Sequence, residues 1–272
     1  MQAMSKRMGV AALFAIGLLA APAAGSEEDR PSASGQPWEK DELLLKDADA
    51  AIEAGGILAL KSRAGALETA LAGGQLTYQV GDTAYILSDG AAESLIALSM
   101  SAGDKSAGAH KAIVVHNPYP RIALYLGSYY DEIGKPDEAL RVLDLGLSRS
   151  AISGIEIGET RPYLLLERGE SLLALKRAAD ALADFDEGLK TDDLDPKIHA
   201  HFDRGRGFAL TELGRLDQAE AAYQASLQLE PNNPTALHEL GYIQGLRKGA
   251  MPLPPGLQSV QPDDKGEPPP SH

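Results

Sequence analysis

The stretch LGRLDQAEAAYQASLQLEPNNPTA, residues 213–236, decides the fold of most of this chain. It consists largely of good helix formers and ends in a Pro-Asn-Asn-Pro stop. If Gly207 just upstream is taken as a marker, Ala219 lies at offset 12, Tyr223 at offset 16 and Ser226 at offset 19. Because a glycine inside a helix costs about 1 kcal/mol relative to alanine, the marker position needs a packing reason.

The same spacing occurs twice more upstream. Gly127 and Gly169 are markers of the same kind, and a further marker, Gly241, opens a half-copy. The residues at offsets 12, 16 and 19 are Ala139, Leu143 and Gly146 in the first copy, and Ala181, Phe185 and Gly188 in the second. The spacings between successive markers are 42, 38 and 34. A repeat of this period predicts helical hairpins that stack into a solenoid.

The pattern suggests a close approach of two helices. The glycine lies on the first helix of a hairpin and the alanine on the second, across a short turn. We expect these two small residues to face each other, so that the backbones come close, with the large residue at offset 16 beside them. Gly134 and Gly214 mark the turn in two copies, whereas Lys176 gives a weaker turn signal in the middle copy.

At this point the chain resembles the tetratricopeptide repeat (TPR) family, over about residues 119–249. The third copy matches best, through Gly207, Leu210, Gly214, Ala219, Tyr223 and Pro231. The first-helix tryptophan of the family is absent, and two loops are longer. The resemblance implies three hairpins and a capping half-repeat, with approximate bounds 119–152, 162–195, 200–233 and 234–249. The predicted fold class is mostly α, a TPR-like α-solenoid preceded by a small α+β unit.

Residues 39–118 form that N-terminal α+β unit in the prediction. Apolar residues at helical spacing predict two helices, one from 39 to 53 and one from 57 until the Gly73-Gly74 stop. The stretch 76–90 alternates instead, with a Gly-Asp turn at its centre, and predicts a β-hairpin. A further helix is expected over 90–102 and a third short strand over 111–115.

The two ends of the chain are predicted to lie outside the folded part. A basic start, an apolar run over Met8–Ala21 and a small-residue exit predict a cleavable signal peptide over 1–25, too short to span a membrane. Residues 26–38 read as a flexible linker and 250–272 as a Pro-rich disordered tail. Because the sequence has no cysteine, it cannot carry a lipidated cysteine or a disulfide. We expect a periplasmic or secreted protein that is not a lipoprotein and has no stable membrane insertion after cleavage.

Charge and motifs argue against several classes of function. The formal net charge of −14 disfavours nucleic acid and anionic membranes as partners. Nucleophile-elbow, Walker and zinc-protease motifs are absent from the sequence. His199 and His201 are two residues apart, so on a helix they point about 200° apart and do not share a metal. We therefore expect no metal, no cofactor and no enzymatic activity.

The resemblance implies a concave groove lined by the first helix of each hairpin. Groove positions fall at offsets −6, −3, +1 and +4 from the marker glycine, which is helical spacing. The candidate partner-binding residues are Arg121, Leu124, Tyr163, Leu166, Glu170, His201, Arg204, Phe208, His238 and Tyr242. Where carboxylate-clamp arrays carry Lys, Asn and Arg, this chain has Leu124, Ser128, Glu167, His201 and Gly205, so a chaperone clamp is not expected.

The predicted function is that of a non-enzymatic adaptor or scaffold. Its groove would bind a peptide segment or a partner protein through exposed apolar groups mixed with Arg and His. An alternative is a structural subunit of an envelope assembly that associates into a homo-oligomer, and a third is an enzyme whose chemistry lies in the N-terminal α+β unit. It also stays open whether the N-terminal unit or the tail already covers the groove.

Overall fold

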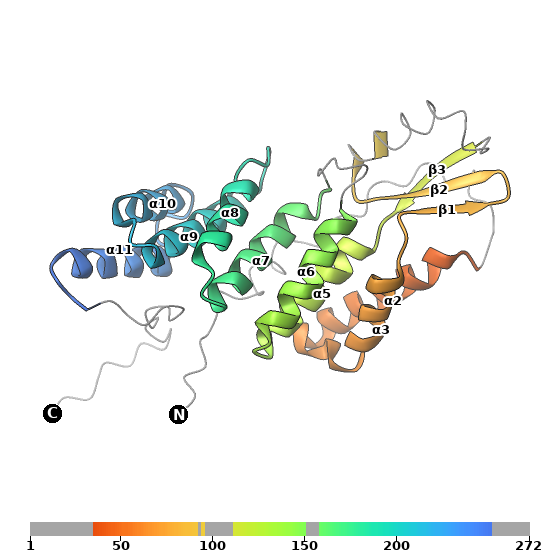
Figure 1. The fold of residues 1–272 in the computed structure, drawn as a ribbon, viewed down its shortest axis with the longest axis horizontal. Coiled ribbons are helices and arrows are strands. Elements are labelled where there is room, and N and C mark those ends of the chain that lie inside the picture. Colours follow the sequence, from red (N-terminus) through yellow and green to blue (C-terminus); the bar gives the residue numbers. More distant parts are fainter. Residues whose placement is uncertain (1–34, 92–93, 96–110, 151–157, 252–272) are drawn as a thin grey trace. The chain divides into compact units, whose positions relative to one another are not determined.

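The computed structural model describes residues 35–91, 94–95, 111–150 and 158–251 (Figure 1). The predicted signal peptide, most of the predicted linker, the tail after Met251 and most of the helix predicted over 90–102 lie outside the described residues. The chain divides into two compact units, which meet in sequence at Leu175 and Lys176. Each unit is described by itself.

The N-terminal unit combines helices with a small sheet. Its elements are α2 (Pro37–Gly55), η2 (Ile57–Ser62), α3 (Ala64–Gly73), β1 (Thr77–Val80), β2 (Thr83–Ser88), β3 (Lys111–His116), α5 (Tyr119–Glu132), α6 (Pro136–Arg149) and α7 (Arg161–Ala174). Helix α2 begins inside the range predicted as linker, because Glu39 accepts hydrogen bonds from the backbone N–H groups of Gly35 and Gln36 and because Trp38 is buried.

The second predicted helix is broken in two at Arg63. Residues 57–62 form the 3₁₀ helix η2, and α3 begins at Ala64, where the sequence pattern predicted one continuous helix. The break brings Arg63 to α2, where its Nε and Nη2 donate to the two carboxylate oxygens of Asp47 at 2.6 and 3.1 Å. This two-point contact joins the two helices, a tertiary effect that helical periodicity does not reveal.

The sheet contains three strands in the order β1-β2-β3. Strands β1 and β2 form the predicted antiparallel hairpin, with Gly81 at φ +61° in its turn. The predicted third strand is β3, which runs parallel to β2 (Figure 1). Trp38 of α2 packs against Tyr78 and Tyr85 in tilted arrangements, with ring centroids 5.2 and 4.6 Å apart, and covers one face of the hairpin.

The N-terminal unit extends past residue 118, where the sequence reading placed its end. Helices α5 and α6 pack against α3 (Figure 1). The ring of Tyr119 is fully buried and fills the space in front of Gly74, where a Cβ would lie only 2.2 Å from the ring. The guanidinium of Arg149 donates to the carbonyls of Gly74 and Ala72, which satisfies the C-terminal end of α3. These contacts make α5 and α6 part of the N-terminal core.

The C-terminal unit is made entirely of helices over its described residues. They are α8 (Ala178–Gly188), α9 (Pro196–Glu212), α10 (Leu216–Leu229) and α11 (Pro234–Arg247), where α11 is the predicted half-repeat. Each helix packs on the next along the chain. The predicted fold class, a TPR-like array preceded by an α+β unit, is confirmed.

The side chain nearest to two of the marker glycines is the large residue at offset 16. A Cβ on Gly127 would lie 2.6 Å from the side chain of Leu143, and one on Gly207 would lie 2.9 Å from the ring of Tyr223. The atoms nearest to a Cβ on each glycine are therefore those of the large residue at offset 16. The alanines are fully buried, but the physical reason for the glycine is a bulky side chain lying directly on its bare backbone. In the middle copy, Gly169 and Phe185 belong to different units.

All three predicted turns share one backbone conformation. Gly134, Lys176 and Gly214 have φ of +75°, +63° and +71°, in the left-handed region. Lys176 is thus a turn residue of the same kind as the two glycines, although its sequence signal is weak. A side chain with a Cβ is strained there, at a cost of about 1 kcal/mol.

Candidate functional site

The predicted groove residues are less exposed than expected. Leu124, Leu166, His201, Arg204 and Phe208 are buried, and Arg121, Tyr163, Glu170, His238 and Tyr242 are half-buried. We call the ten predicted groove residues the stripe. The prediction that its apolar side chains are exposed is therefore wrong for Leu124, Leu166 and Phe208. Solvent reaches the half-buried residues of the stripe. Four of them lie on α7 and α11, namely Tyr163, Glu170, His238 and Tyr242.

Arg121, the stripe residue nearest the N-terminus of α5, binds helix α2 of the same chain. Arg121 Nη2 lies 3.2 Å from Asp49 Oδ1, and its Nε donates to the Tyr125 hydroxyl at 2.9 Å. That hydroxyl donates in turn to Asp49 at 2.6 Å. Arg121, Tyr125 and Asp49 form a closed triangle across α2 and α5, so the N-terminal unit occupies this part of the predicted groove.

Two more tyrosines of α5 donate to carboxylates of the preceding helices. The hydroxyl of Tyr119 donates to Asp41, and that of Tyr130 to Glu68, both at 2.9 Å. Burial raises the pKa of Tyr130 to about 12, and the bond to Glu68 adds to this shift. We call Tyr119, Tyr125 and Tyr130 the tyrosine row. The sequence reading missed it, although Asp41 and Asp49 lie eight residues apart, on one face of α2.

Farther along the stripe, serines and carboxylates pair between α5 and α7. Ser128 of α5 donates to Glu167 of α7 at 2.6 Å, and Ser171 of α7 donates to Asp131 of α5 at 2.5 Å. All four side chains are buried. Because a buried carboxylate without a donor is costly, these reciprocal bonds fix the alignment of the two helices.

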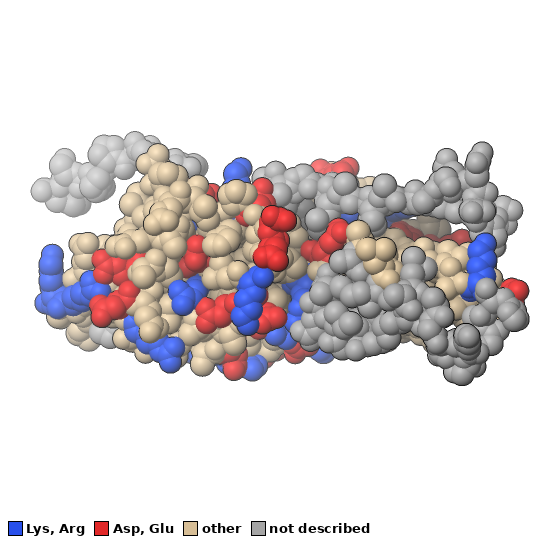
Figure 2. All heavy atoms as spheres, turned by 90° about the horizontal axis from the view of Figure 1, so that it is seen from above, with Lys and Arg blue, Asp and Glu red and all other residues tan. Residues whose placement is uncertain are grey.

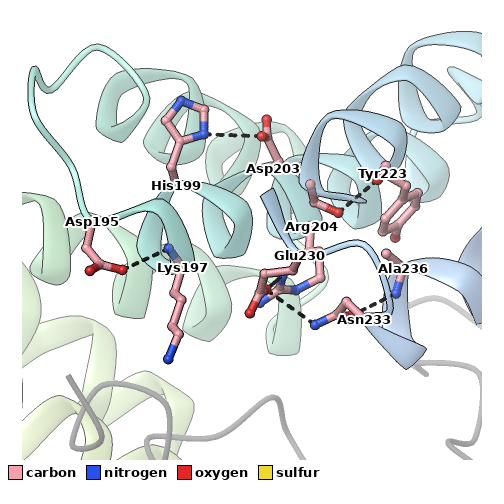
Figure 3. Close-up of polar contacts among 10 residues, drawn as sticks. Asp195, Lys197, His199, Asp203, Arg204, Tyr223, Glu230, Asn233 and Ala236 are labelled. Carbon is pink, nitrogen blue, oxygen red and sulfur yellow. Dashed lines mark hydrogen bonds and ion pairs between the residues drawn. The ribbon is translucent and has the colours of Figure 1, made fainter. Parts of the chain in front are cut away.

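Arg204 of α9 lies at the junction of α10 and α11. Its Nη1 pairs with Glu230, which follows the last residue of α10, and Asn233 Nδ2 donates to the same carboxylate at 3.4 Å (Figure 3). Asn233 caps α11 by accepting a bond from the backbone N–H of Ala236 at 3.2 Å. The Nε of Arg204 is buried and has no hydrogen-bond partner among the described residues.

The two histidines of the sequence His199-Ala200-His201 lie in different surroundings. His199 Nδ1 is 3.3 Å from Asp203 Oδ2, one turn along α9 (Figure 3). His201, by contrast, is buried. Burial raises the pKa of Asp203, and His199 opposes that shift. Within the described ranges, no group of three or more His, Cys, Asp and Glu side chains could hold a metal ion.

Polar residues at the carboxyl ends of β2 and β3 join the sheet to helices. Asp89 accepts bonds from the backbone N–H and the hydroxyl of Thr160 at 2.9 and 2.8 Å, which joins the end of β2 to the residue before α7. His116 Nδ1 lies 2.5 Å from Glu42 Oε1 on α2. Ser88 is buried and donates to the carbonyl of Gly90 at 2.9 Å. This edge of the sheet is where an α/β enzyme would place its chemistry, but these bonds tie structural elements together.

Charges of both signs alternate on the surface. Figure 2 shows Lys and Arg next to Asp and Glu on the described residues of the face in view. Several of them form ion pairs, such as Arg206 with Asp186 and Arg247 with Asp217, each at 2.6 Å. Among the described helices, none has the length and apolar character needed to cross a bilayer.

Comparison with known proteins identifies one repeat. Residues 207–246 match the family model described as TPR repeat. Similar solved structures include the first TPR of Spaghetti (RPAP3) bound to an HSP90 peptide (25% identity, TM-score 0.42, covering 50% of this chain and 100% of that one). Another is the first TPR domain of human RPAP3, solved by NMR (27% identity, TM-score 0.41, covering 48% and 94%). No curated protein matches the chain.

Proposed function

We propose that this chain, a member of the tetratricopeptide repeat family through residues 207–246, is an exported, non-enzymatic adaptor that holds a segment of a partner protein. The predicted signal peptide supports export to the periplasm or the medium. The repeat fold supports protein interaction, which is the usual work of such arrays.

Binding is assigned to the part of the stripe on α11, where Arg204 of α9 lies at the junction with that helix. On α5, Arg121 is already paired with Asp49 of the same chain. On α11, His238 and Tyr242 lie one turn apart and are half-buried, so solvent reaches part of each side chain. Side chains of this kind bind well because little entropy is lost when a partner covers them.

The buried Nε–H of Arg204 is the observation that carries this assignment. A buried donor without an acceptor costs about 1–3 kcal/mol. The guanidinium is held in place by Glu230, so this donor is fixed in direction at the junction with α11. A partner that offers a carbonyl or carboxylate oxygen would satisfy it, and the partner segment is therefore expected to contribute an acceptor beside an aromatic or aliphatic side chain.

A photo-crosslinking amino acid placed at Tyr242 tests this proposal. Purified protein carrying it is exposed to an envelope extract and irradiated, and the adducts are identified by mass spectrometry. The matched control carries the same group at Gln244, which is exposed on the same helix. We expect a defined adduct from position 242 that Arg204→Lys weakens, because lysine keeps the charge but lacks the Nε–H group. Equal adducts from both positions would refute the groove assignment.

Export is tested separately by cell fractionation and by the mass of the mature chain. Cleavage after Ala23, Ala24 or Gly25 is expected, and an intact mass that retains Met8–Ala21 in the cytosolic fraction would contradict it.

A further inference from the structure

The second helix of a hairpin presents a large residue and then a small one to the first helix. In the first copy, the atoms nearest to a Cβ on Gly127 of α5 belong to Leu143 of α6. Gly146 follows Leu143 by three residues, and a Cβ added to it would lie 2.3 Å from the side chain of Ala123. The marker glycine therefore receives the large residue, and the residue four positions before the marker receives the small one.

On α11, the last helix among the described residues, the corresponding face is bare (Figure 1). A Cβ added to Gly241 would meet no atom of the described residues within 4 Å. Leu237, four positions before this marker, has an exposed fraction of 51%. Pro234 and Gln244 are exposed on the same face, so every exposed residue from 234 to 244 is uncharged. Because the core of a protein interface is depleted of charged residues, this face is suited to contact with another helix.

We propose that α11 of a second copy of this chain covers this face, running antiparallel to it. A twofold axis midway between Leu237 and Gly241 places Leu237 of each copy on Gly241 of the other. In the direction of the chain, Leu237 and Gly241 are a large residue followed by a small one. The second helices α6 and α10 have the same order, with Leu143 before Gly146 and Tyr223 before Ser226. Each α11 thus serves its partner as the second helix of a hairpin.

Twofold symmetry closes this contact. Each copy offers one exposed leucine and one bare glycine on a single face, so one contact covers both leucines and fills the space over both glycines. At the first described hairpin, α3 already packs on α5 and α6, so a head-to-tail contact would have to displace part of the N-terminal core. Because one helix from each copy makes the contact, we expect a weak, reversible dimer and not a filament.

Sedimentation equilibrium of the full-length chain over a dilution series tests the dimer. Leu237→Gln should raise its dissociation constant at least about tenfold, because the contact buries this leucine from both copies. The matched control is Leu229→Gln, the same change at an exposed leucine of α10, which should leave the constant unchanged. A chain that is monomeric at every concentration, or equal effects of the two substitutions, would overturn the proposal.

The substitution Gly241→Gln distinguishes a lost contact from a damaged fold. On the bare face of the monomer, glutamine has a higher helix propensity than glycine, so Tm of the dilute chain should rise. In the dimer its side chain takes the space of the opposing leucine, so the dissociation constant should rise at least about tenfold. A higher Tm with unchanged association would place the dimer contact elsewhere and refute the proposal.

Disulfide exchange between two single-cysteine chains tests the antiparallel direction, because the sequence has no cysteine of its own. The proposed axis brings Pro234 of one copy opposite Gln244 of the other. Chains carrying Pro234→Cys and Gln244→Cys are mixed and oxidised mildly, and the products are identified by intact mass. We expect the mixed disulfide to form at least about tenfold faster than either symmetrical one, because equal positions then lie about 15 Å apart along the helix axis. Faster symmetrical products would show a parallel pair, and rates that differ only by chance pairing would show random collision. Either result would contradict the proposal.

Discussion

Helices α5 and α9 hold the same place in two copies of one repeat, but their surroundings differ. On α5, the tyrosine row and Arg121 bind carboxylates of α2 and α3, which lie outside the repeat. On α9, Arg204 binds Glu230, which belongs to the same hairpin. Helix α5 is therefore covered by another part of the chain, whereas α9 is held by a residue of its own repeat.

This difference shows that the residues that define the repeat are not the residues that define the exposed face of a helix. Gly127 and Gly207 pack in the same way, each under the large residue at offset 16. The residues that decide what a helix can bind lie at other positions and follow no repeat rule, since Arg121 corresponds to His201 and Leu124 to Arg204. Similar scaffolds can therefore present very different surfaces.

The largest effect is expected from removing the offset-16 side chains, which tests whether the two copies share their packing. Tyr223→Ala should destabilise by about 3–5 kcal/mol and Leu143→Ala by about 2–5 kcal/mol, because both side chains are buried against a glycine and a cavity would remain. Chemical denaturation measures the change. Leu229→Ala, at an exposed position of α10, is the control and should cost less than about 1 kcal/mol. Costs no larger than that control would refute the shared packing.

The next effect concerns the contact that only α5 makes. Tyr125→Phe should destabilise the N-terminal unit by about 1–3 kcal/mol, because Asp49 and Arg121 both lose the hydroxyl that joins them. Tyr129→Phe is the matched control, since its hydroxyl makes no hydrogen bond among the described residues. Hydrogen exchange of α2 and α5 should show faster opening in the first variant. Unchanged protection would mean that α2 is held by other contacts.

A smaller effect on stability is expected at the turns. Substitution of Lys176 should change it in the opposite direction from substitution of Gly134 or Gly214. Lys176→Gly should stabilise by about 0.5–1 kcal/mol, because it removes left-handed strain at φ +63°. Gly134→Ala and Gly214→Ala should destabilise by about 1 kcal/mol for the same reason. Thermal unfolding of the three variants checks the signs. A loss of stability in Lys176→Gly would show that its side chain has a role beyond the turn.

The smallest effect should come from Tyr130, and it disappears in alkali. Its pKa is raised from 10.0 to about 12, so its contribution to stability is fully present below pH 10 and is lost as the pH rises toward 12. Tyr130→Phe should flatten the pH dependence of unfolding in that window relative to the unmodified chain. Identical slopes for the two proteins would contradict the bond to Glu68.

The sequence reading succeeded where local rules act and failed where distant segments meet. Offsets of 12, 16 and 19 located the hairpins, and alternation located β1 and β2, because both depend on residues near in sequence. It did not identify the side chain that lies nearest to each marker glycine, since spacing shows that a small residue is needed but not which side chain lies on it. It also ended the N-terminal unit too early, because the burial of Tyr119 depends on Gly74 and Asp41.

The candidate groove shows the same limit. Its positions followed from helical spacing, but whether each side chain is open to a partner depends on what other segments cover. Asp49 reaches Arg121 although η2, α3 and the whole sheet lie between them in the sequence, so no local pattern contains this contact. The repeat, its period and its turns were thus determined by sequence alone, because each is an interaction between neighbours along the chain. Which faces stay available was decided only by tertiary structure, because burial is a property of the whole fold.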